Sequence, residues 1–380
     1  MWTFKGRIIT LCLFFSLCYC QDGSNDYPLN EDYSIPGEPT KDCTCVPYYQ
    51  CENGKIVDDG SGIIDPRKKP QEEELALDEK YVPPACGPYH VCCSAPEDHP
   101  VKPYEHRCGM RNANGINSRI LSANDKGEAE FGEWPWQAAI LKTEGKNKVF
   151  KCGGTLIDEL HIITVAHCVD SFLEKPSQLT VRLGEWDTQT ESEFMPHEDF
   201  TVEQIIMHPE YRKNNLHNDI AILRVDKEVE FKGHIDTACL PRDEDDFVGH
   251  DCVVTGWGTD AYKSGRYSNI MKEVIMPVIS NEECQAKLRK TRLGRYFKLD
   301  KGFMCAGGEE NKDSCKGDGG GPLSCYRQED NSYTVAGLVS WGIDCGKADV
   351  PGVYMNLKKY IDWIALQTGK NVEDYWSKSP

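Results

Sequence analysis

The sequence contains no apolar run long enough to cross a membrane. The longest candidate, residues 8–17, is interrupted by two hydroxyl-bearing residues, whereas a membrane-spanning helix needs about 20 apolar residues. The basic residues Lys5 and Arg7 precede this run, and that arrangement is typical of a secretory signal. We therefore expect residues 1–20 to be a signal peptide and the chain to be secreted; a membrane-anchor helix is the alternative.

Positive charge is also scarce in this chain. Lysine and arginine number 43 against 61 aspartates and glutamates, which gives a formal net charge of −18. Nucleic acids and anionic membranes are themselves negatively charged, so a chain this acidic is a poor candidate for binding either of them. Acidity by itself identifies no partner.

The paired cysteine motifs of a zinc site are missing as well. Cys43 and Cys45 lie close together, but no matching second pair accompanies them. Three of the 19 cysteines, Cys12, Cys18 and Cys20, fall within the predicted signal, which leaves sixteen. An even number of cysteines in a secreted chain favours disulfide pairing throughout.

A small cysteine-rich region follows a polar, proline-bearing stretch, residues 21–42, which we expect to be a flexible arm. Six cysteines over 51 residues enclose little hydrophobic core, so disulfides must hold such a unit together. Fifteen pairings are possible in principle. We predict a disulfide-stapled domain over residues 43–93, containing Cys43, Cys45, Cys51, Cys86, Cys92 and Cys93.

The long interval between Cys51 and Cys86 is polar and contains a basic cluster. Arg67, Lys68 and Lys69 stand together, followed by a proline and an acidic run. A basic cluster in an exposed loop is suited to cleavage by a trypsin-like enzyme. We expect the cut between Arg67 and Lys68; a plain solvated loop is the alternative.

The remaining chain, after a linker at residues 94–107, alternates short apolar runs with turns. Regularly spaced short runs with glycine and proline between them predict an all-β barrel or sandwich. Residues 359–367 predict a closing helix with Ile361, Ile364 and Ala365 on one face. The predicted strands are residues 154–157, 161–164, 179–183, 220–225, 252–256, 335–340 and 352–356.

Five motifs in residues 108–367 together resemble the trypsin/chymotrypsin family of serine proteases. Residues 164–168 match its catalytic-histidine motif and residues 218–223 its catalytic-aspartate motif. Residues 255–258, 340–342 and 351–354 match three further family motifs. Each motif alone is weak, but all five in order leave little room for another fold. The resemblance implies two packed six-stranded β-barrels in a domain over residues 108–380.

The resemblance also assigns catalytic roles, one of which this chain lacks. It makes His167 the general base and Asp219 the residue that orients it. The family has Gly-Asp-Ser-Gly-Gly-Pro around its nucleophile, whereas residues 317–322 read Gly-Asp-Gly-Gly-Gly-Pro. Gly319 therefore stands at the nucleophile position, and glycine offers no oxygen to form an acyl-enzyme. This predicts an inactive protease; a residual weak trypsin-like peptidase is the alternative.

The resemblance further implies a trypsin-like specificity pocket. Asp313 corresponds to the base of that pocket, and Gly342 and Gly352 to its open walls. A buried carboxylate there would bind an arginine or lysine side chain without cutting. An empty or self-plugged relic is the alternative.

The activation site departs from the family pattern. The family reads Arg-Ile-Val-Gly-Gly, whereas residues 119–123 read Arg-Ile-Leu-Ser-Ala. Cleavage in the family frees an isoleucine amine that pairs with the residue corresponding to Asp318. The loss of both glycines puts that pairing, and with it a formed oxyanion hole, in question.

One candidate metal site is implied. Residues 185–193 correspond to the calcium-binding loop of trypsin-like relatives and include Glu185, Asp187 and Glu193. Closely spaced carboxylates and carbonyls are suitable ligands for calcium. A solvated acidic loop is the alternative, and no organic cofactor is expected.

The cysteine-rich region resembles the clip domain of arthropod proteases. It opens with Cys-Thr-Cys, contains the adjacent Cys92 and Cys93, and precedes the protease-like region; another small disulfide knot is the alternative. The clip family implies the pairs Cys43–Cys92, Cys45–Cys86 and Cys51–Cys93. The protease family implies the pairs Cys108–Cys239, Cys152–Cys168, Cys252–Cys325, Cys284–Cys305 and Cys315–Cys345.

The whole arrangement resembles the clip-domain serine protease homologues of arthropods, which are circulating cofactors of the melanization cascade. The resemblance implies a non-catalytic haemolymph protein that a protease switches on. Its expected partners are prophenoloxidase and the activating clip-domain protease, with self-association after cleavage as a further expectation. A microbial pattern-recognition or adhesion protein is the alternative from another class.

Overall fold

The structure is a computed structural model of the 380-residue chain. It describes residues 43–47, 51–52, 55–56, 90–94, 104–116, 127–145, 147–189, 195–259, 267–309, 318–343 and 346–376. Several predicted features lie outside these residues: the signal peptide, the arm, Arg67, Lys68, Cys86, the activation segment 119–123, Glu193, Asp313, Cys315 and Cys345. Within the described residues, no helix combines the length and apolar character needed to span a lipid bilayer.

The N-terminal region contains a small four-stranded sheet of order β1-β4-β3-β2. Its antiparallel pair β1–β4 places Cys45 opposite Cys92 and Thr44 opposite Cys93. Cys45 and Cys93 are both disulfide-bonded. The three pairings implied for this region stay predictions. The strands are β1 (Cys43–Pro47), β2 (Cys51–Glu52), β3 (Lys55–Ile56) and β4 (His90–Ser94).

The first large unit is a closed antiparallel barrel of order β10-β7-β6-β5-β8-β9. Its strands bury aliphatic side chains such as Ile140, Ile162 and Leu223, each 0% exposed, and this burial supplies the main stabilising free energy. The strands are β5 (Gln137–Glu144), β6 (Asn147–Leu156), β7 (His161–Thr164), β8 (Leu179–Leu183), β9 (Glu198–Met207) and β10 (Ala221–Val225).

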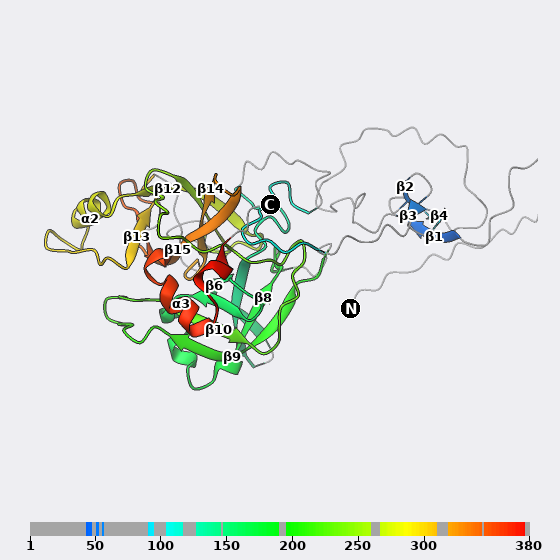
Figure 1. The fold of residues 1–380 in the computed structure, drawn as a ribbon, viewed down its shortest axis with the longest axis horizontal. Coiled ribbons are helices and arrows are strands. Elements are labelled where there is room, and N and C mark those ends of the chain that lie inside the picture. The colour runs from blue at the N-terminus through cyan, green and yellow to red at the C-terminus, as the bar shows by residue number, and fades with distance from the viewer. Residues whose placement is uncertain are drawn as a thin grey trace, which may run out of the picture.

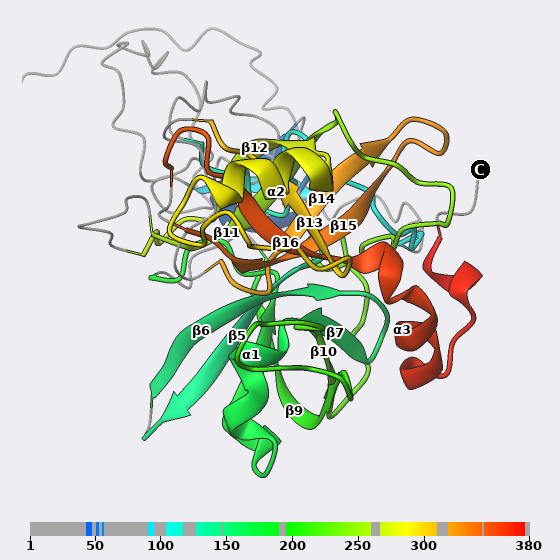
Figure 2. The ribbon, with the colours of Figure 1, turned by 90° about the vertical axis from the view of Figure 1, so that its left-hand side faces the viewer.

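The second unit is another closed antiparallel barrel, of order β11-β12-β13-β16-β15-β14. Figures 1 and 2 show the two barrels one above the other, the first in green and the second in yellow to orange. The prediction of two six-stranded barrels is confirmed. The strands are β11 (Asp251–Gly256), β12 (Lys272–Ile279), β13 (Phe303–Ala306), β14 (Pro322–Arg327), β15 (Ser332–Trp341) and β16 (Gly352–Asn356).

Helices are few and short. The helix α1 (Ala166–Val169) follows β7, and α2 (Asn281–Arg289) follows β12. The closing helix α3 (Ile361–Thr368) buries Ile361, Ile364 and Ala365, the predicted face, and ends at Gly369, whose φ of 73° suits a left-handed cap. The described residues also form the 3-10 turns η2 (Asp170–Phe172), η3 (Pro176–Gln178), η4 (Leu357–Lys359) and η5 (Val372–Tyr375).

Buried polar contacts join the two barrels. The Thr255 hydroxyl donates to Gln137 Oε1 at 2.6 Å, and Trp136 Nε1 donates to Ser324 Oγ at 3.2 Å. Four disulfides that the resemblance implied are present. They are Cys108–Cys239, Cys152–Cys168, Cys252–Cys325 and Cys284–Cys305.

Candidate functional site

His167 is held at the junction of the barrels by the short helix that carries it. Its neighbours Ala166, Cys168 and Val169 are buried, and the disulfide from Cys168 to Cys152 ties the helix to β6. The His167 side chain itself is 33% exposed. The backbone is therefore fixed while the imidazole remains accessible from solvent.

Asp219 lies two residues before the start of β10 and is 0% exposed. Its Oδ1 accepts the backbone N–H of His167 at 2.8 Å, and its Oδ2 lies 2.7 Å from His167 Nδ1. The Ser340 hydroxyl donates to the same Oδ2 at 2.8 Å. A carboxylate that receives three hydrogen bonds is well compensated for its burial. The arrangement fixes the ring with Nε2 facing away from Asp219, as a general base requires.

Gly319 occupies the position opposite Nε2. A Cβ built there would lie 3.5 Å from His167 Nε2 and 3.6 Å from Cys168 Sγ, both ordinary contact distances. The Gly319 carbonyl accepts the N–H of Gly153 at 2.9 Å, which holds this loop against β6. The site thus has room for a small side chain beside the imidazole, and residue 319 places no oxygen there.

The conformation of the loop around Gly319 requires glycine at positions 320 and 258, for different reasons. Gly320 has a φ of 82°, and a Cβ there would overlap the Thr164 hydroxyl. Gly258 donates its N–H to Asp318 Oδ1 at 2.8 Å, and a Cβ on Gly258 would overlap the Asp318 carboxylate. The close approach of Asp318 explains why the Thr-Gly-Trp-Gly motif needs this glycine.

The predicted specificity pocket is described only in part. Gly342 follows β15, and a Cβ built on it would meet nothing within 4 Å, so this side of the residue faces open space. Gly352 begins β16, is buried and pairs with Ala306. Asp313, the predicted base of the pocket, lies outside the described residues.

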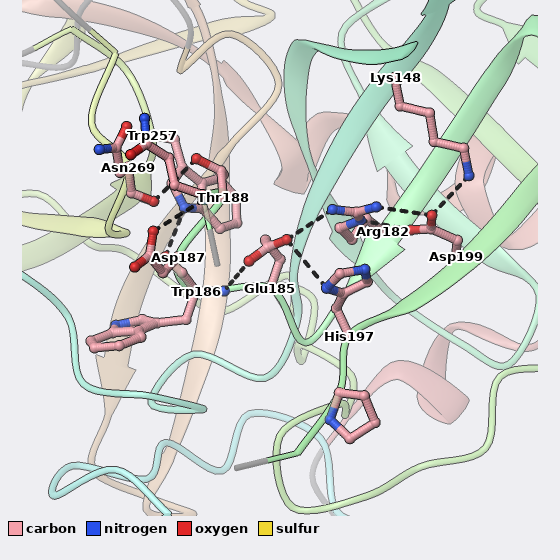
Figure 3. A network of polar contacts seen from close by, with 12 residues as sticks. Lys148, Arg182, Glu185, Trp186, Asp187, Thr188, His197, Asp199, Trp257 and Asn269 are labelled. Carbon is pink, nitrogen blue, oxygen red and sulfur yellow. Dashed lines mark hydrogen bonds and ion pairs between the residues drawn. The ribbon is translucent and has the colours of Figure 1, made fainter. Parts of the chain in front are cut away.

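In the described part of the predicted calcium loop, Glu185 lies beside a cation from the preceding strand, Arg182 of β8 (Figure 3). Glu185 is 4% exposed, and its Oε2 lies 3.0 Å from Arg182 Nη1 and 3.4 Å from His197 Nδ1. Asp187 Oδ1 accepts the N–H of Gln189 at 3.1 Å. Among the described residues, no group of three or more histidine, cysteine, aspartate or glutamate side chains is arranged to hold a metal ion.

Arg182 also binds Asp199 through two hydrogen bonds, of 2.7 and 3.0 Å, and Lys148 adds a third at 2.8 Å. Burial alone would raise the pKa of Asp199. The bonds from Arg182 and Lys148 outweigh that effect and lower the pKa to about 2. Arg182 thus pairs with Glu185 of the loop as well as with Asp199 of β9, and the predicted calcium site stays a prediction.

Sequence reasoning identified His167, Asp219 and Gly319, and the structure brings all three together. It missed the role of Ser340, although this serine stands in a motif that the sequence does show. It also missed Arg182. The local sequence does not show either role, because Ser340 meets Asp219, and Arg182 meets Asp199, only once the barrels close.

Both regions of the chain match known protein families. A family model described as Trypsin matches residues 124–364, and one described as the serine protease Clip domain PPAF-2 matches residues 35–94. Both matches agree with the barrels and with the small N-terminal sheet.

Several curated proteins are similar over most of the chain. The inactive CLIP domain-containing serine protease A3 of Aedes aegypti is 40% identical over 85% of this chain and 66% of its own length. The phenoloxidase-activating factor 2 of Galleria mellonella is 44% identical over 68% of this chain and 87% of its own. The inactive CLIP domain-containing serine protease A28 of Anopheles gambiae is 35% identical over 94% of this chain and 95% of its own length.

Proposed function

The chain belongs to the trypsin family of serine proteases and carries a clip domain, and from this premise we propose that it is a secreted, non-catalytic cofactor of prophenoloxidase activation. In this role it acts by binding, in the extracellular cascade that leads to melanization. Its partners are prophenoloxidase and the clip-domain protease that activates it.

The absence of a nucleophile at position 319 carries this proposal. The base and its orienting carboxylate are within hydrogen-bonding distance, since His167 Nδ1 lies 2.7 Å from Asp219 Oδ2. The third catalytic position is Gly319, in place of the family's serine. In subtilisin, loss of the catalytic serine costs about 10⁶ in kcat. A loss of that size leaves no useful turnover, which supports a role in binding for the retained architecture.

The names of similar proteins also support a non-catalytic role in phenoloxidase activation. Three relatives are called inactive serine proteases, and two are called phenoloxidase-activating factors. Proteins named as serine proteases, such as stubble and filzig of Drosophila melanogaster, are also similar at 35% and 38% identity. Family membership alone therefore does not decide activity, and position 319 has to be considered directly.

A reconstitution tests the cofactor role. Cleaved protein, prophenoloxidase and the activating protease are combined, and each is omitted in turn while phenoloxidase activity is followed. We expect full activity only from the complete mixture. Equal activity without this chain would contradict the proposal, and selective retention of the chain on microbial polysaccharide would favour a recognition protein instead.

A hydrolysis assay tests the loss of catalysis separately. Purified, cleaved protein should not turn over arginine or lysine peptide substrates. Turnover that survives His167→Ala would identify a contaminating protease. Turnover that His167→Ala abolishes would show that the site is active despite Gly319.

A further inference from the structure

Charge is unevenly distributed along this acidic chain. Residues 287–301 contain seven lysines and arginines and one acidic residue, Asp300, although the chain as a whole has a net charge of −18. The segment begins in the last turn of α2 and continues to β13. Figure 1 shows α2 and the yellow loop after it at one end of the second barrel, and Figure 2 shows α2 from the front.

Five of these cations are exposed and available for binding. Lys287 pairs with Glu283 at 3.1 Å, and Arg289 donates to the carbonyl of Phe297 at 2.8 Å, so these two have structural roles. Within the described part of the chain, the other five form no ion pair. These five exposed residues, which we call the basic loop, are Lys290, Arg292, Arg295, Lys298 and Lys301.

The basic loop is held in shape by a series of turns. The Thr291 hydroxyl donates to the Leu288 carbonyl at 2.6 Å, and Gln285 Oε1 accepts the N–H of Leu299 at 3.1 Å. The disulfide Cys284–Cys305 fastens α2 to β13 below them. A loop whose backbone is already ordered loses little conformational entropy when it binds a partner.

An aromatic side chain stands among the cations. Tyr296 is 80% exposed, and the Arg295 guanidinium lies 4.7 Å from the centre of its ring. The next residue, Phe297, packs edge-on against Trp341 of β15, with 6.1 Å between the ring centres. An exposed tyrosine with an arginine against its ring has the composition of a protein-binding hot spot.

We propose that the basic loop is a docking surface for an acidic segment of a partner protein, one with several aspartates or glutamates and an apolar side chain that covers Tyr296. A long polyanion fits less well, because it would run beyond this short loop onto the acidic remainder of the surface. A compact segment contacts only the loop, since repulsion from more distant charges is screened beyond about 8 Å at physiological salt. The surface goes beyond the proposed cofactor role and does not depend on it.

A direct binding experiment tests the proposal. The probe is a fluorescein-labelled peptide of eight glutamates with one central phenylalanine, titrated with the full-length protein and followed by fluorescence anisotropy. The matched probe replaces every glutamate by glutamine. We expect saturable binding of the glutamate peptide only, with at least a tenfold loss of affinity between 50 and 300 mM salt.

Paired variants locate the surface. Arg292→Glu with Lys298→Glu should weaken binding at least tenfold, and Tyr296→Ala should weaken it severalfold. The matched control, Lys175→Glu with Lys227→Glu, makes the same change in net charge on the exposed surface of the first barrel and should leave affinity unchanged. All variants should retain the wild-type Tm, because they change exposed side chains.

Two outcomes would overturn the proposal. Equal weakening in the control pair would show that net charge, not the basic loop, governs binding. Tighter binding of heparin than of the peptide, with no effect of Tyr296→Ala, would show that the loop is a site for polyanions. Either result leaves the cofactor reconstitution unaffected, so the two claims are tested separately.

Discussion

At position 319 a glycine lies next to His167 Nε2, and the space beside it accommodates a Cβ at ordinary contact distances. Gly319→Ser should therefore fold with an unchanged Tm, because its Cβ meets only ordinary contacts at 3.5 and 3.6 Å. We expect it to restore little hydrolysis of arginine substrates, since residues 119–123 have lost the activation pattern. Steady-state kinetics on the cleaved variant measure this.

Full recovery by Gly319→Ser would show that the oxyanion hole is already formed and that the interpretation of the activation segment is wrong. Gly319→Ala is the matched control, since it adds the same Cβ without a nucleophile. It should remain inactive under every condition.

A second prediction at this scale concerns Asp199 and pH. Its folded pKa of about 2 lies below the ordinary value of about 3.9, so its contribution to stability is complete above pH 4 and is lost as the pH falls through 2. The carboxylate is partly exposed, and screening reduces the contribution to on the order of 1 kcal/mol. Asp199→Asn should lower the free energy of unfolding by that amount at pH 7. In urea titrations, the difference should shrink between pH 4 and pH 2.

The difference in the free energy of unfolding between wild type and Asp199→Asn could instead stay constant over that pH range. This would mean that the bonds from Arg182 and Lys148 do not depend on the negative charge of Asp199. Such a result would assign the effect of the substitution to packing.

Single residues also show which parts of the candidate site the sequence could predict. His167, Asp219 and Gly319 were identified because each stands in a local motif with a fixed pattern. Arg182 has no such motif, since its carboxylate partners lie three and seventeen residues away on a different element or loop. Contacts that depend on strand register come from the closed barrel and not from the local sequence.

At the scale of elements, apolar runs predicted several buried strands but missed others that are equally buried, including β5, β13 and β14. Residues 179–183 and 352–356 are strands with the predicted bounds, and residues 220–225 differ from β10 by one residue. The strand β9 (Glu198–Met207) was missed because only Phe200 and Val202 are buried in it. The helix α2 was missed for a similar reason, since it buries only Cys284 and Leu288. A single buried pair gives no periodic signal.

The calcium loop remains a proposal at this scale, and Arg182 makes it testable. A calcium ion and the guanidinium would compete for the Glu185 carboxylate. Calcium at a hundredfold excess over its dissociation constant stabilises a binding site by about 2.7 kcal/mol. We expect calcium to raise the Tm of Arg182→Ala more than that of the wild type in differential scanning fluorimetry.

Equal Tm shifts in wild type and Arg182→Ala would show that calcium binds without Glu185. Unchanged curves for both proteins, with and without chelator, would reject the calcium loop. Lys148→Ala is the matched control, because Lys148 pairs with Asp199 and not with Glu185.

For the whole molecule, we propose that cleavage acts at the clip domain. The loop between Cys51 and Cys86 carries Arg67 and Lys68, and a proline after Lys69 disfavours the last basic position. The cascade's activating protease should release a new amino terminus at Lys68. Under the implied pairing of the clip cysteines, the two fragments should stay together until they are reduced. Gels with and without reductant, followed by amino-terminal sequencing, measure both points.

A cut found only after Arg119, together with full cofactor activity of Arg67→Ala, would reject this switch. The disulfide Cys108–Cys239 bears on that alternative, because it keeps the segment before residue 119 attached to the barrels after cleavage. Release of fragments therefore does not distinguish the two sites, whereas the sequenced amino terminus does.

The central claim is that this chain acts without catalysis, and His167 offers the most direct test. In the reconstitution with prophenoloxidase and the activating protease, cleaved His167→Ala should support the same phenoloxidase activity as the wild type. A cofactor that acts by binding does not need this imidazole as a general base. Loss of activity in a well-folded His167→Ala protein, with a wild-type Tm, would contradict the account, because it would show that the retained base takes part in chemistry.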